Sequence, residues 1–552
     1  MHGNRNGGVY MTDKRKPLSG ALAALLVATA LLPAVALAQI ESPGYTVGTK
    51  QVDLTWTAGP QVVDGKLELT MWEAIEIALR RNYALVIERY NLEEAGFRLT
   101  ENRGIYDFGV TVDLSGFSET NPSATNLDGA DIIVRENNRL NLGISQLNRV
   151  GGTFEVDMIN SRTESNSTFS TLNPSFRVDL DLTYRQPLLR DLGKLATARS
   201  LIIATNNLDV SRETFEQQVI EVLRTVGQNY WTLIEAIQQL LVAEESLSLA
   251  EGLHEQNKIR VDVGTMAPLE LVQSEAGMAT RRDEYIRAQI DVGNAEDDLR
   301  ESLNIPDGQL WDVEIIPQTP PDITRIEIDV AEAVRSALRN RPEVRSKRLQ
   351  NKNLDVDSEY FQNQKKPRLD LTGTYGWNGL GGDVTERDFF TGDIIFQAPG
   401  GYGDAIDAVW GRDFEGWSWA LNLSIPIQNR AGKARHTIAD IAVERGDAEL
   451  AQLELQVSTE VRKSARGVTT AEALVDSTRV SRRLERANLE AEQKRYENGM
   501  STSFQVLEIQ EDLANARSNA VRAETGYRKA LIEYFRAIGT LDEVLGVELQ
   551  ND

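Results

Sequence analysis

The sequence contains no cysteine among its 552 residues. Disulfides, thiolate metal sites and thiol catalysis are therefore excluded, and so is a lipid anchor attached through cysteine. Histidine is nearly as scarce, because only His2, His254 and His436 occur. The first precedes a signal segment and the other two lie far apart in long polar segments, so we expect no metal site and no cofactor.

Basic residues are too few to balance the acidic ones. The sequence has 59 lysine and arginine residues against 83 aspartate and glutamate residues, which gives a net charge of -24. A surface this acidic repels phosphate backbones, so the composition argues against nucleic acid as a partner. It favours the passage or encounter of cations.

Long apolar runs are confined to the N-terminus. Lys14, Arg15 and Lys16 precede an apolar run at 18–37 that ends in a small-residue cleavage pattern at 36–38, which is typical of a signal peptide. We expect cleavage after Ala38, with 1–10 as an upstream extension and Met11 as a second candidate start. The mature sequence has no later run of about 20 apolar residues, so closed β-structure is its remaining route across a membrane.

Three motifs occur twice, in the same order and at matching spacing. They are an acidic-apolar motif at 73–80 and 332–339, an X-Pro segment at 186–194 and 425–433, and a glycine-ended segment at 260–264 and 495–499. This duplication predicts a first repeat at 39–303 and a second at 330–540. A proline-rich linker at 304–329 separates the repeats, and a short tail follows at 541–552.

Each repeat contains a very long helical segment. Apolar residues recur about every 3.5 positions at Val219, Leu223, Val226, Tyr230, Leu233, Ile237, Leu240 and Leu247, and again at Leu450, Leu453, Val457, Val461, Ala465, Val468, Val480, Leu484 and Ala487. This spacing predicts the seam of a left-handed coiled coil. A proline-free helix over 194–260 would reach on the order of 100 Å, which suits a structure that spans the periplasm.

Between the helices the apolar period changes from 3.5 to 2. Apolar and polar residues alternate over 110–114, 176–184, 369–375 and 417–425. This alternation is typical of barrel strands with a lipid-facing side and a polar lumen, and Tyr184, Trp417 and Trp419 would suit an interfacial aromatic girdle. A soluble sandwich with one buried face shows the same alternation; the signal peptide and the helix lengths favour the membrane.

The first repeat contains an additional hairpin. Residues 140–146 and 154–159 alternate cleanly around a turn at 149–152. The second repeat has no counterpart, so the pattern leaves open whether the hairpin near 138–160 joins a barrel or stands outside it. Residues 376–416, which are rich in glycine and aromatic residues, are expected to form an extracellular loop.

Together these features resemble the TolC family of outer-membrane efflux and secretion channels, over about 69–541. The most specific pieces are the duplication, the segment at 184–193 and the two glycine turns. The resemblance implies a mixed α/β-barrel membrane protein. In it, a homotrimer shares one twelve-strand barrel, each chain giving four core strands, and the long helices form a periplasmic α-barrel. Four strands cannot close a barrel alone, since about eight is the small end.

The resemblance also implies roles for the two glycine turns. They would lie at the periplasmic tip and dock onto a periplasmic adaptor protein, at Val263, Gly264, Thr265, Asn498, Gly499 and Met500. A tight helix-to-helix turn needs a glycine for positive φ in any case.

A gate is implied near these turns. A polar link would join Glu270 to Tyr496, and Gln505 and Glu508 would occupy the positions of aperture acids. Three copies of Glu508 would attract cations, although a single acid on a solvated helix face has the same sequence. The family pattern has an arginine where this sequence has Ser501.

The sequence therefore predicts a passive exit duct in the outer membrane, opened by an adaptor and an inner-membrane transporter. No nucleophile, base and oxyanion donor occur as a set, so no catalytic residues are expected. The alternative is a periplasmic coiled-coil scaffold or adaptor, which would not explain the amphipathic strands. The exported substrate, and the choice between an efflux pump and type I secretion, are left open; neighbouring genes for a proton-driven or an ATP-driven transporter would decide between them.

Overall fold

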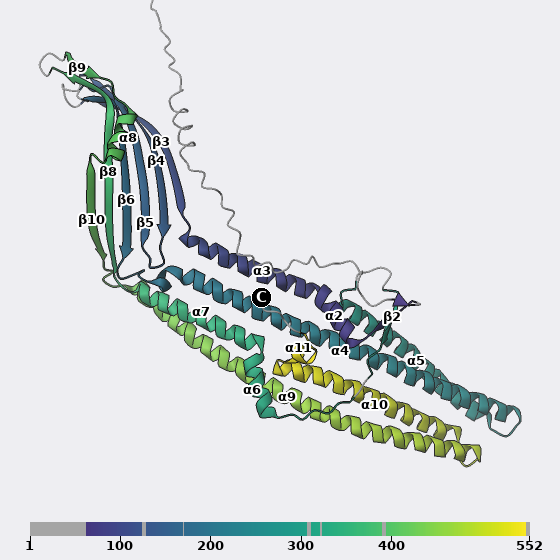
Figure 1. Ribbon diagram of the computed structural model, residues 1–552. Helices are drawn as coiled ribbons and strands as arrows, with labels where there is room; N and C mark the ends of the chain where they lie inside the picture. Colours follow the sequence, from purple (N-terminus) through teal and green to yellow (C-terminus); the bar gives the residue numbers. More distant parts are fainter. Residues whose placement is uncertain are drawn as a thin grey trace, which may run out of the picture. The chain divides into compact units, whose positions relative to one another are not determined.

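A computed structural model describes residues 62–63, 65–123, 129–168, 170–305, 311–320, 323–388 and 393–547. The signal segment, the candidate start at Met11, His2 and the mature N-terminus at Gln39 lie outside these residues. Two kinds of structure dominate the described part: long helices and one antiparallel sheet of long strands (Figure 1).

The helices form two series in the order that the duplication predicts. The first comprises α2 (Met71–Arg81), α3 (Tyr83–Arg103), α4 (Lys194–Asp262) and α5 (Pro268–Ser302). The second comprises α6 (Val330–Asn340), α7 (Pro342–Gln364), α9 (Arg430–Glu497) and α10 (Ser503–Ile538). Short pieces complete the set: η1 (Gly104–Tyr106), α8 (Tyr402–Gly411) and α11 (Leu541–Val544).

The repeated acidic-apolar motif begins equivalent helices. The Thr70 hydroxyl accepts a bond from the Glu73 backbone N–H at 3.2 Å, while the Thr70 N–H donates to the Glu73 carboxylate at 2.8 Å. Asp329 likewise caps α6 by accepting from the Ala331 N–H at 2.8 Å. These caps satisfy N–H groups that the first helical turn leaves unpaired.

The long helices have the predicted length and most of the predicted seam. Helices α4 and α9 contain 69 and 68 residues, and the seam residues Leu223, Val226 and Val461 are fully buried. The prediction is wrong farther along α9, where Val480 and Leu484 are exposed and the flanking residues Val475 and Leu489 are buried instead. The buried residues Val461, Val468, Val475, Leu489 and Tyr496 keep a strict seven-residue repeat along α9, and Val480 and Leu484 lie off that repeat.

Two apolar cores hold the helical part together. One lies among α2, α4, α5 and a small sheet formed by β1 (Val62–Val63), β2 (Lys66–Leu69) and β7 (Glu314–Pro317). The other lies among α6, α9 and α10. In the described part of the chain, no helix combines the length and apolar character needed to cross a bilayer.

The large sheet contains the four predicted core strands and the predicted hairpin. The core strands are β3 (Gly109–Pro122), β6 (Leu172–Pro187), β8 (Arg368–Arg387) and β10 (Glu415–Ser424). The hairpin is β4 (Ile132–Leu147) and β5 (Thr153–Ser165), and it pairs between β3 and β6. The order is β10-β8-β6-β5-β4-β3, with the short β9 (Ile394–Ala398) beside β8. The open question about the hairpin is thus answered: it belongs to the sheet.

The predicted loop at 376–416 is largely ordered structure. Strand β8 continues to Arg387, and β9 and α8 follow. Helix α8 packs on β6 and β8 through Ala405 and Val409, which contact Val178. Glycine favours close approach here: a Cβ on Gly379 would lie 1.8 Å from the Ala405 carbonyl oxygen. The glycines that suggested a loop are therefore packing sites of a strand.

Candidate functional site

The two glycine turns have the same backbone geometry. After α4, the Gly264 N–H donates to the Val261 carbonyl at 2.9 Å, and the Thr265 N–H donates to the Arg260 carbonyl at 2.9 Å. After α9, Gly499 and Met500 make the equivalent bonds to Tyr496 and Arg495, at 3.1 and 2.9 Å. Both turns are Schellman motifs.

Each turn requires glycine because of its positive φ angle, and not because a larger side chain would clash with neighbouring atoms. The φ angles are +75° at Gly264 and +72° at Gly499, and a Cβ at either position would meet nothing within 4 Å. Asn498 and Thr265 reinforce the turns, because their side chains donate to the Lys494 and Arg260 carbonyls at 2.7 and 3.0 Å. The geometry therefore agrees with the interpretation that each glycine provides the positive φ of a tight turn.

Apolar side chains are exposed around both turns. Val263 is 67% exposed and Met500 is 64% exposed. Leu269 and Phe504, in the first turns of α5 and α10, are also exposed. Neighbouring exposed apolar side chains on a helical tip are typical of a protein-docking surface.

The two helical hairpins contact each other close to the turns. Leu253 of α4 packs with Tyr496 of α9 and Val506 of α10 in one small apolar cluster. A Cβ on Gly277 of α5 would lie 3.0 Å from Leu507 of α10. The tips of the two repeats therefore form one packed end.

Glu270 and Tyr496 lie at this contact, but each bonds to a different partner from the predicted one. The Tyr496 hydroxyl donates to the Asn257 side-chain oxygen, and the Glu270 carboxylate accepts from the Ser503 hydroxyl and from the Ser503 N–H. The Arg260 guanidinium lies over the Tyr496 ring, 4.5 Å from its centroid. The direct Glu270–Tyr496 link is thus replaced by two links that each still join the first repeat to the second.

Burial gives Tyr496 an unusual electrostatic environment. Its side chain is 4% exposed. Burial raises the pKa of its hydroxyl; Arg260 opposes this effect and Glu270 adds to it. Tyr496 therefore stays a neutral hydrogen-bond donor at physiological pH.

A second polar group lies beside the second turn. The buried Glu492 accepts from Arg495 at 2.8 Å and from the Ser501 hydroxyl. Ser501 also contacts the Gln505 side-chain oxygen at 3.0 Å. Sequence reasoning missed Asn257, Ser503 and Glu492, because uncharged or single polar residues on long polar helices carry no recognisable spacing.

The two candidate aperture residues share one face of α10. Gln505 and Glu508 are three positions apart and both are exposed, so they lie on the same side of the helix. Asp512 extends this exposed polar side by a further turn. A single chain thus presents the polar side that an aperture would need.

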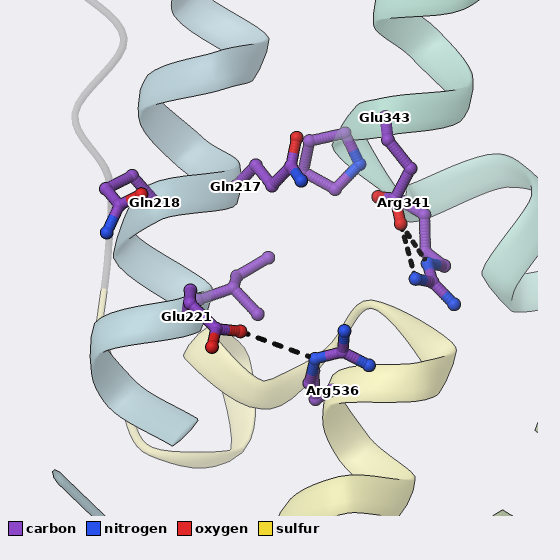
Figure 2. A pocket seen from close by; sticks show the side chains of 8 residues that line it. Gln217, Gln218, Glu221, Arg341, Glu343 and Arg536 are labelled. Carbon is purple, nitrogen blue, oxygen red and sulfur yellow. Dashed lines mark hydrogen bonds and ion pairs between the residues drawn. The ribbon is translucent and has the colours of Figure 1, made fainter. Parts of the chain in front are cut away.

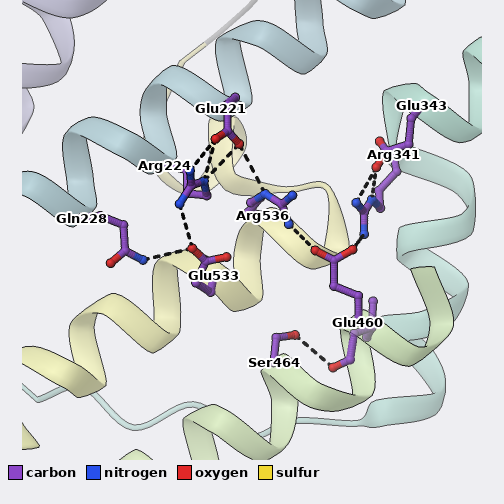
Figure 3. A network of polar contacts seen from close by, with 10 residues as sticks. Glu221, Arg224, Gln228, Arg341, Glu343, Glu460, Ser464, Glu533 and Arg536 are labelled. Carbon is purple, nitrogen blue, oxygen red and sulfur yellow. Dashed lines mark hydrogen bonds and ion pairs between the residues drawn. The ribbon is translucent and has the colours of Figure 1, made fainter. Parts of the chain in front are cut away.

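A larger polar network joins α4, α7, α9 and α10 away from the tip (Figure 3). Glu460 accepts from Arg341 at 2.6 Å and from Arg536. Arg224 of α4 donates to Glu221 at 3.0 Å and to Glu533 of α10 at 3.2 Å. Figure 2 shows the shallow polar pocket beside this network, where Gln217, Gln218 and Glu343 join Glu221, Arg341 and Arg536.

Opposing effects set the pKa values of this network. Burial raises the pKa of Glu460, but the hydrogen bonds from Arg341 and Arg536 outweigh burial and leave its pKa lowered. The same balance with Arg224 leaves the pKa of Glu221 lowered. These are paired, charged groups that fasten helices together.

The two histidines in the described part of the chain contact different partners. His254 contacts Ser274 at 3.1 Å, and His436 contacts Asp440 at 2.8 Å.

Comparisons with known proteins agree with this architecture. Residues 158–304 and 333–540 match the family described as outer membrane efflux protein. A search of curated proteins finds no match.

Several solved structures share the fold. The outer-membrane channel OprN superposes with a TM-score of 0.61 at 16% identity, covering 85% of this chain and 89% of OprN. The Campylobacter jejuni outer membrane channel CmeC gives 0.60 at 16% identity, covering 85% of this chain and 86% of CmeC. The Vibrio cholerae outer membrane protein VceC gives 0.59 at 14% identity, covering 85% of this chain and 96% of VceC.

The family match covers most of both repeats and confirms the predicted TolC-type fold. Proteins of this family are transport channels and not enzymes. The chain belongs to the outer membrane efflux protein family: it is an outer-membrane efflux channel that extends into the periplasm.

Proposed function

We propose that three copies of the chain form one passive exit duct. The tips of its helical hairpins close the periplasmic entrance, and a periplasmic adaptor together with an inner-membrane transporter opens it. The polar links between the two repeats at the tip carry this proposal, because they are contacts that an opening movement must break.

The proposed gate depends on the positions of these links. Asn257 and Glu270 belong to the α4–α5 hairpin, whereas Tyr496 and Ser503 belong to the α9–α10 hairpin. A displacement of one hairpin along or away from the other separates both pairs at once. Each hydrogen bond contributes about 1 to 3 kcal/mol, so an adaptor needs only a modest preference for the open tip to shift the equilibrium.

The gate predicts higher conductance when a link is removed. Tyr496→Phe deletes only the hydroxyl that bonds Asn257, and Glu270→Ala deletes the acceptor for Ser503. Both should raise single-channel conductance in planar bilayers, and the double variant should raise it further. The reason is that the closed tip loses contacts that the open tip never makes.

Matched controls lie on the same hairpin. The Tyr285 hydroxyl accepts from Gln289 four residues along α5, so Tyr285→Phe removes a bond within one helix. Glu275 is an exposed acid five residues beyond Glu270. Tyr285→Phe and Glu275→Ala should leave conductance unchanged; wild-type conductance in Tyr496→Phe and Glu270→Ala alike would disprove the gate.

The exposed apolar tip supports the docking half of the proposal. Val263 and Met500 are exposed beside the turn glycines, and the backbone conformation of each turn depends on its glycine and not on these apolar side chains. An adaptor with an apolar helical hairpin of its own would bury these side chains and remove apolar area from water.

Docking is tested by variants that preserve the trimer. Gly499→Trp should abolish export, and Val263→Asp combined with Met500→Asp should do the same while retaining both turn glycines. Export is measured as loss of a fluorescent pump substrate from cells, and trimers by native gel. Gly293→Trp is the control, because Gly293 is exposed on α5 with open space around it. Normal export by the tip variants would remove the docking assignment.

A further inference from the structure

The sheet is wider than the four strands expected of each subunit. Strands β4 and β5 pair along their length with each other, with β3 on one side and with β6 on the other. Within the described residues, the second repeat contributes only β8 and β10 as long strands and has no counterpart of this pair. The hairpin is therefore an addition that has been built into the wall of the sheet.

Side-chain rows cross all six long strands without interruption. One row is entirely apolar and runs Val110, Ile144, Val156, Leu182, Tyr375, Trp417. The adjacent row, on the other face, runs Thr111, Gly143, Asp157, Asp181, Gly376, Gly416. The register of the hairpin therefore keeps the apolar and polar faces of its neighbours continuous, as a membrane barrel requires, and its two strands preserve the alternation of strand direction.

The pairing register also has the slope of a barrel wall. At the end where the strands meet the helices, Ser424 of β10 is level with Arg368 of β8. At the other edge, Gly109 of β3 is level through the ladders with Thr374, six residues farther along β8. Six residues at about 3.3 Å across five spacings of about 4.8 Å give a slope of about 40°. Transmembrane barrels have strand tilts of about 35–45°.

Both edges of this sheet are open. All fourteen residues of β3 and all ten of β10 are exposed. Six strands are too few to close by themselves, and an unpaired edge is not tolerated in lipid. Strands β3 and β10 run in opposite directions, because β3 leaves the helix side and β10 returns to it. Each edge therefore fits the opposite edge of a second copy as an antiparallel partner.

We propose that the outer-membrane barrel of this protein has eighteen strands, six from each of three copies, with β3 of one copy paired to β10 of the next. This inference rests on the trimer of the proposed function. Because barrel diameter grows roughly in proportion to strand number, the barrel is about half as wide again as one of twelve strands. The narrowest point of the duct then lies among the helices and not in the outer membrane.

Disulfide crosslinking tests the joint between copies, since the natural sequence has no cysteine. Thr111 faces the polar side of β3, and Ala420, Asn422 and Ser424 face the same side of β10. Thr111→Cys is combined in turn with Ala420→Cys, Asn422→Cys and Ser424→Cys, which sample the registers that face polarity permits. At least one pair should give crosslinked dimers and trimers on non-reducing gels.

A second pair tests the width of the wall. Thr111 and Asp181 occupy one polar row but are separated by three strand spacings, about 14 Å, which is too far for a disulfide. If the hairpin stood outside the barrel, β3 and β6 would be neighbours and Thr111→Cys/Asp181→Cys would crosslink within one chain. We expect no crosslink from this pair, as judged by mass spectrometry of the linked peptides.

Electron cryo-microscopy of the wild-type trimer in nanodiscs gives a direct strand count that needs no variant. Eighteen strands would confirm the proposal. Twelve strands, or an efficient Thr111→Cys/Asp181→Cys disulfide in trimers that still export, would overturn the wide barrel and leave the channel function intact. A monomeric native mass together with no crosslinked oligomers would instead overturn the trimer, and the wide barrel with it.

Discussion

Arg341 is the residue of the polar network whose replacement we expect to cost the most stability. It is 6% exposed and donates to Glu343 at 2.7 Å and to Glu460 at 2.6 Å. Its replacement would remove the cation that the Glu343 and Glu460 carboxylates share and leave Glu460 with Arg536, a costly loss in a partly buried site. The residue therefore fastens α9 to the start of α7.

We predict that Arg341→Met lowers the free energy of unfolding by about 2 kcal/mol, because charged hydrogen bonds of this kind contribute about 1.5 to 3 kcal/mol. Arg339 is the matched control, since it pairs with Glu332 at the surface of the preceding helix. Arg339→Met should cost less than about 0.5 kcal/mol. Urea titration in detergent measures both; equal losses would show that burial of Arg341 contributes nothing special.

The residues at the tip show how far sequence reasoning reaches. The glycine turns were predictable because positive φ demands glycine, and Gly264 and Gly499 have it. The partners of Glu270 and Tyr496 were not predictable. Successive helical residues differ by about 100° in direction, so a small shift of one helix along another exchanges one hydrogen-bond partner for another. The partners in the structure are Asn257 for Tyr496 and Ser503 for Glu270.

At the scale of elements, the contact of α8 with the sheet depends on glycines in β8. We predict that Gly379→Ala detaches α8, because the new Cβ would lie 1.8 Å from the Ala405 carbonyl oxygen, a backbone atom that can give way only if the helix moves. Gly373 is the control: it lies on the same strand, and a Cβ there meets nothing within 4 Å.

A buried reporter makes this detachment measurable. Val409 is 4% exposed in α8, so Val409→Cys would be the single thiol of the chain. Gly379→Ala should raise its rate of labelling by a water-soluble maleimide about tenfold or more, which corresponds to a loss of about 1.4 kcal/mol. Gly373→Ala should not change the rate. Slow labelling in both would mean that α8 accommodates the added methyl group.

The elements themselves were predictable to different degrees. Strong periodicity identified α4, α9 and the core strands, because a buried stripe or face repeats along each of them. The far part of β8 and helix α8 were missed, since Gly379 and Gly381 resemble loop residues until the helix that packs on them is known. A glycine is the only sign of a close backbone approach in the sequence, and glycines also occur in strands for several other reasons.

At the scale of the whole molecule, duplication explains most of the architecture. The features that distinguish this protein are those in which the two repeats differ or contact each other. The two helical series are equivalent, but the polar network and the tip links each use residues of both. The additional hairpin occurs in one repeat only, so the sheet is widened once per chain. Sequence periodicity revealed the hairpin, whereas its place in the sheet depended on long-range pairing that alternation does not encode.

The network that joins the two repeats makes stability depend on pH. Burial raises the pKa of Glu460, yet the bonds from Arg341 and Arg536 outweigh it, so its folded pKa lies below the ordinary value of 4.5. A carboxyl with a lowered folded pKa stabilises the fold above its ordinary pKa and loses this effect as pH falls through the folded value. Wild type should therefore be more stable than Glu460→Gln, by a nearly constant margin between about pH 5 and 7.

Below about pH 4.5 we predict that this margin shrinks and then closes, because the protonated Glu460 of the wild type resembles the amide. The measurement is the midpoint of thermal unfolding of both proteins in detergent at a series of pH values. Glu444→Gln is the control, because Glu444 is exposed on the same helix, α9, and should follow wild type at every pH. A margin between wild type and Glu460→Gln that persists unchanged down to about pH 3, below the ordinary carboxyl range, would show that the network owes its stabilisation to packing and not to charge.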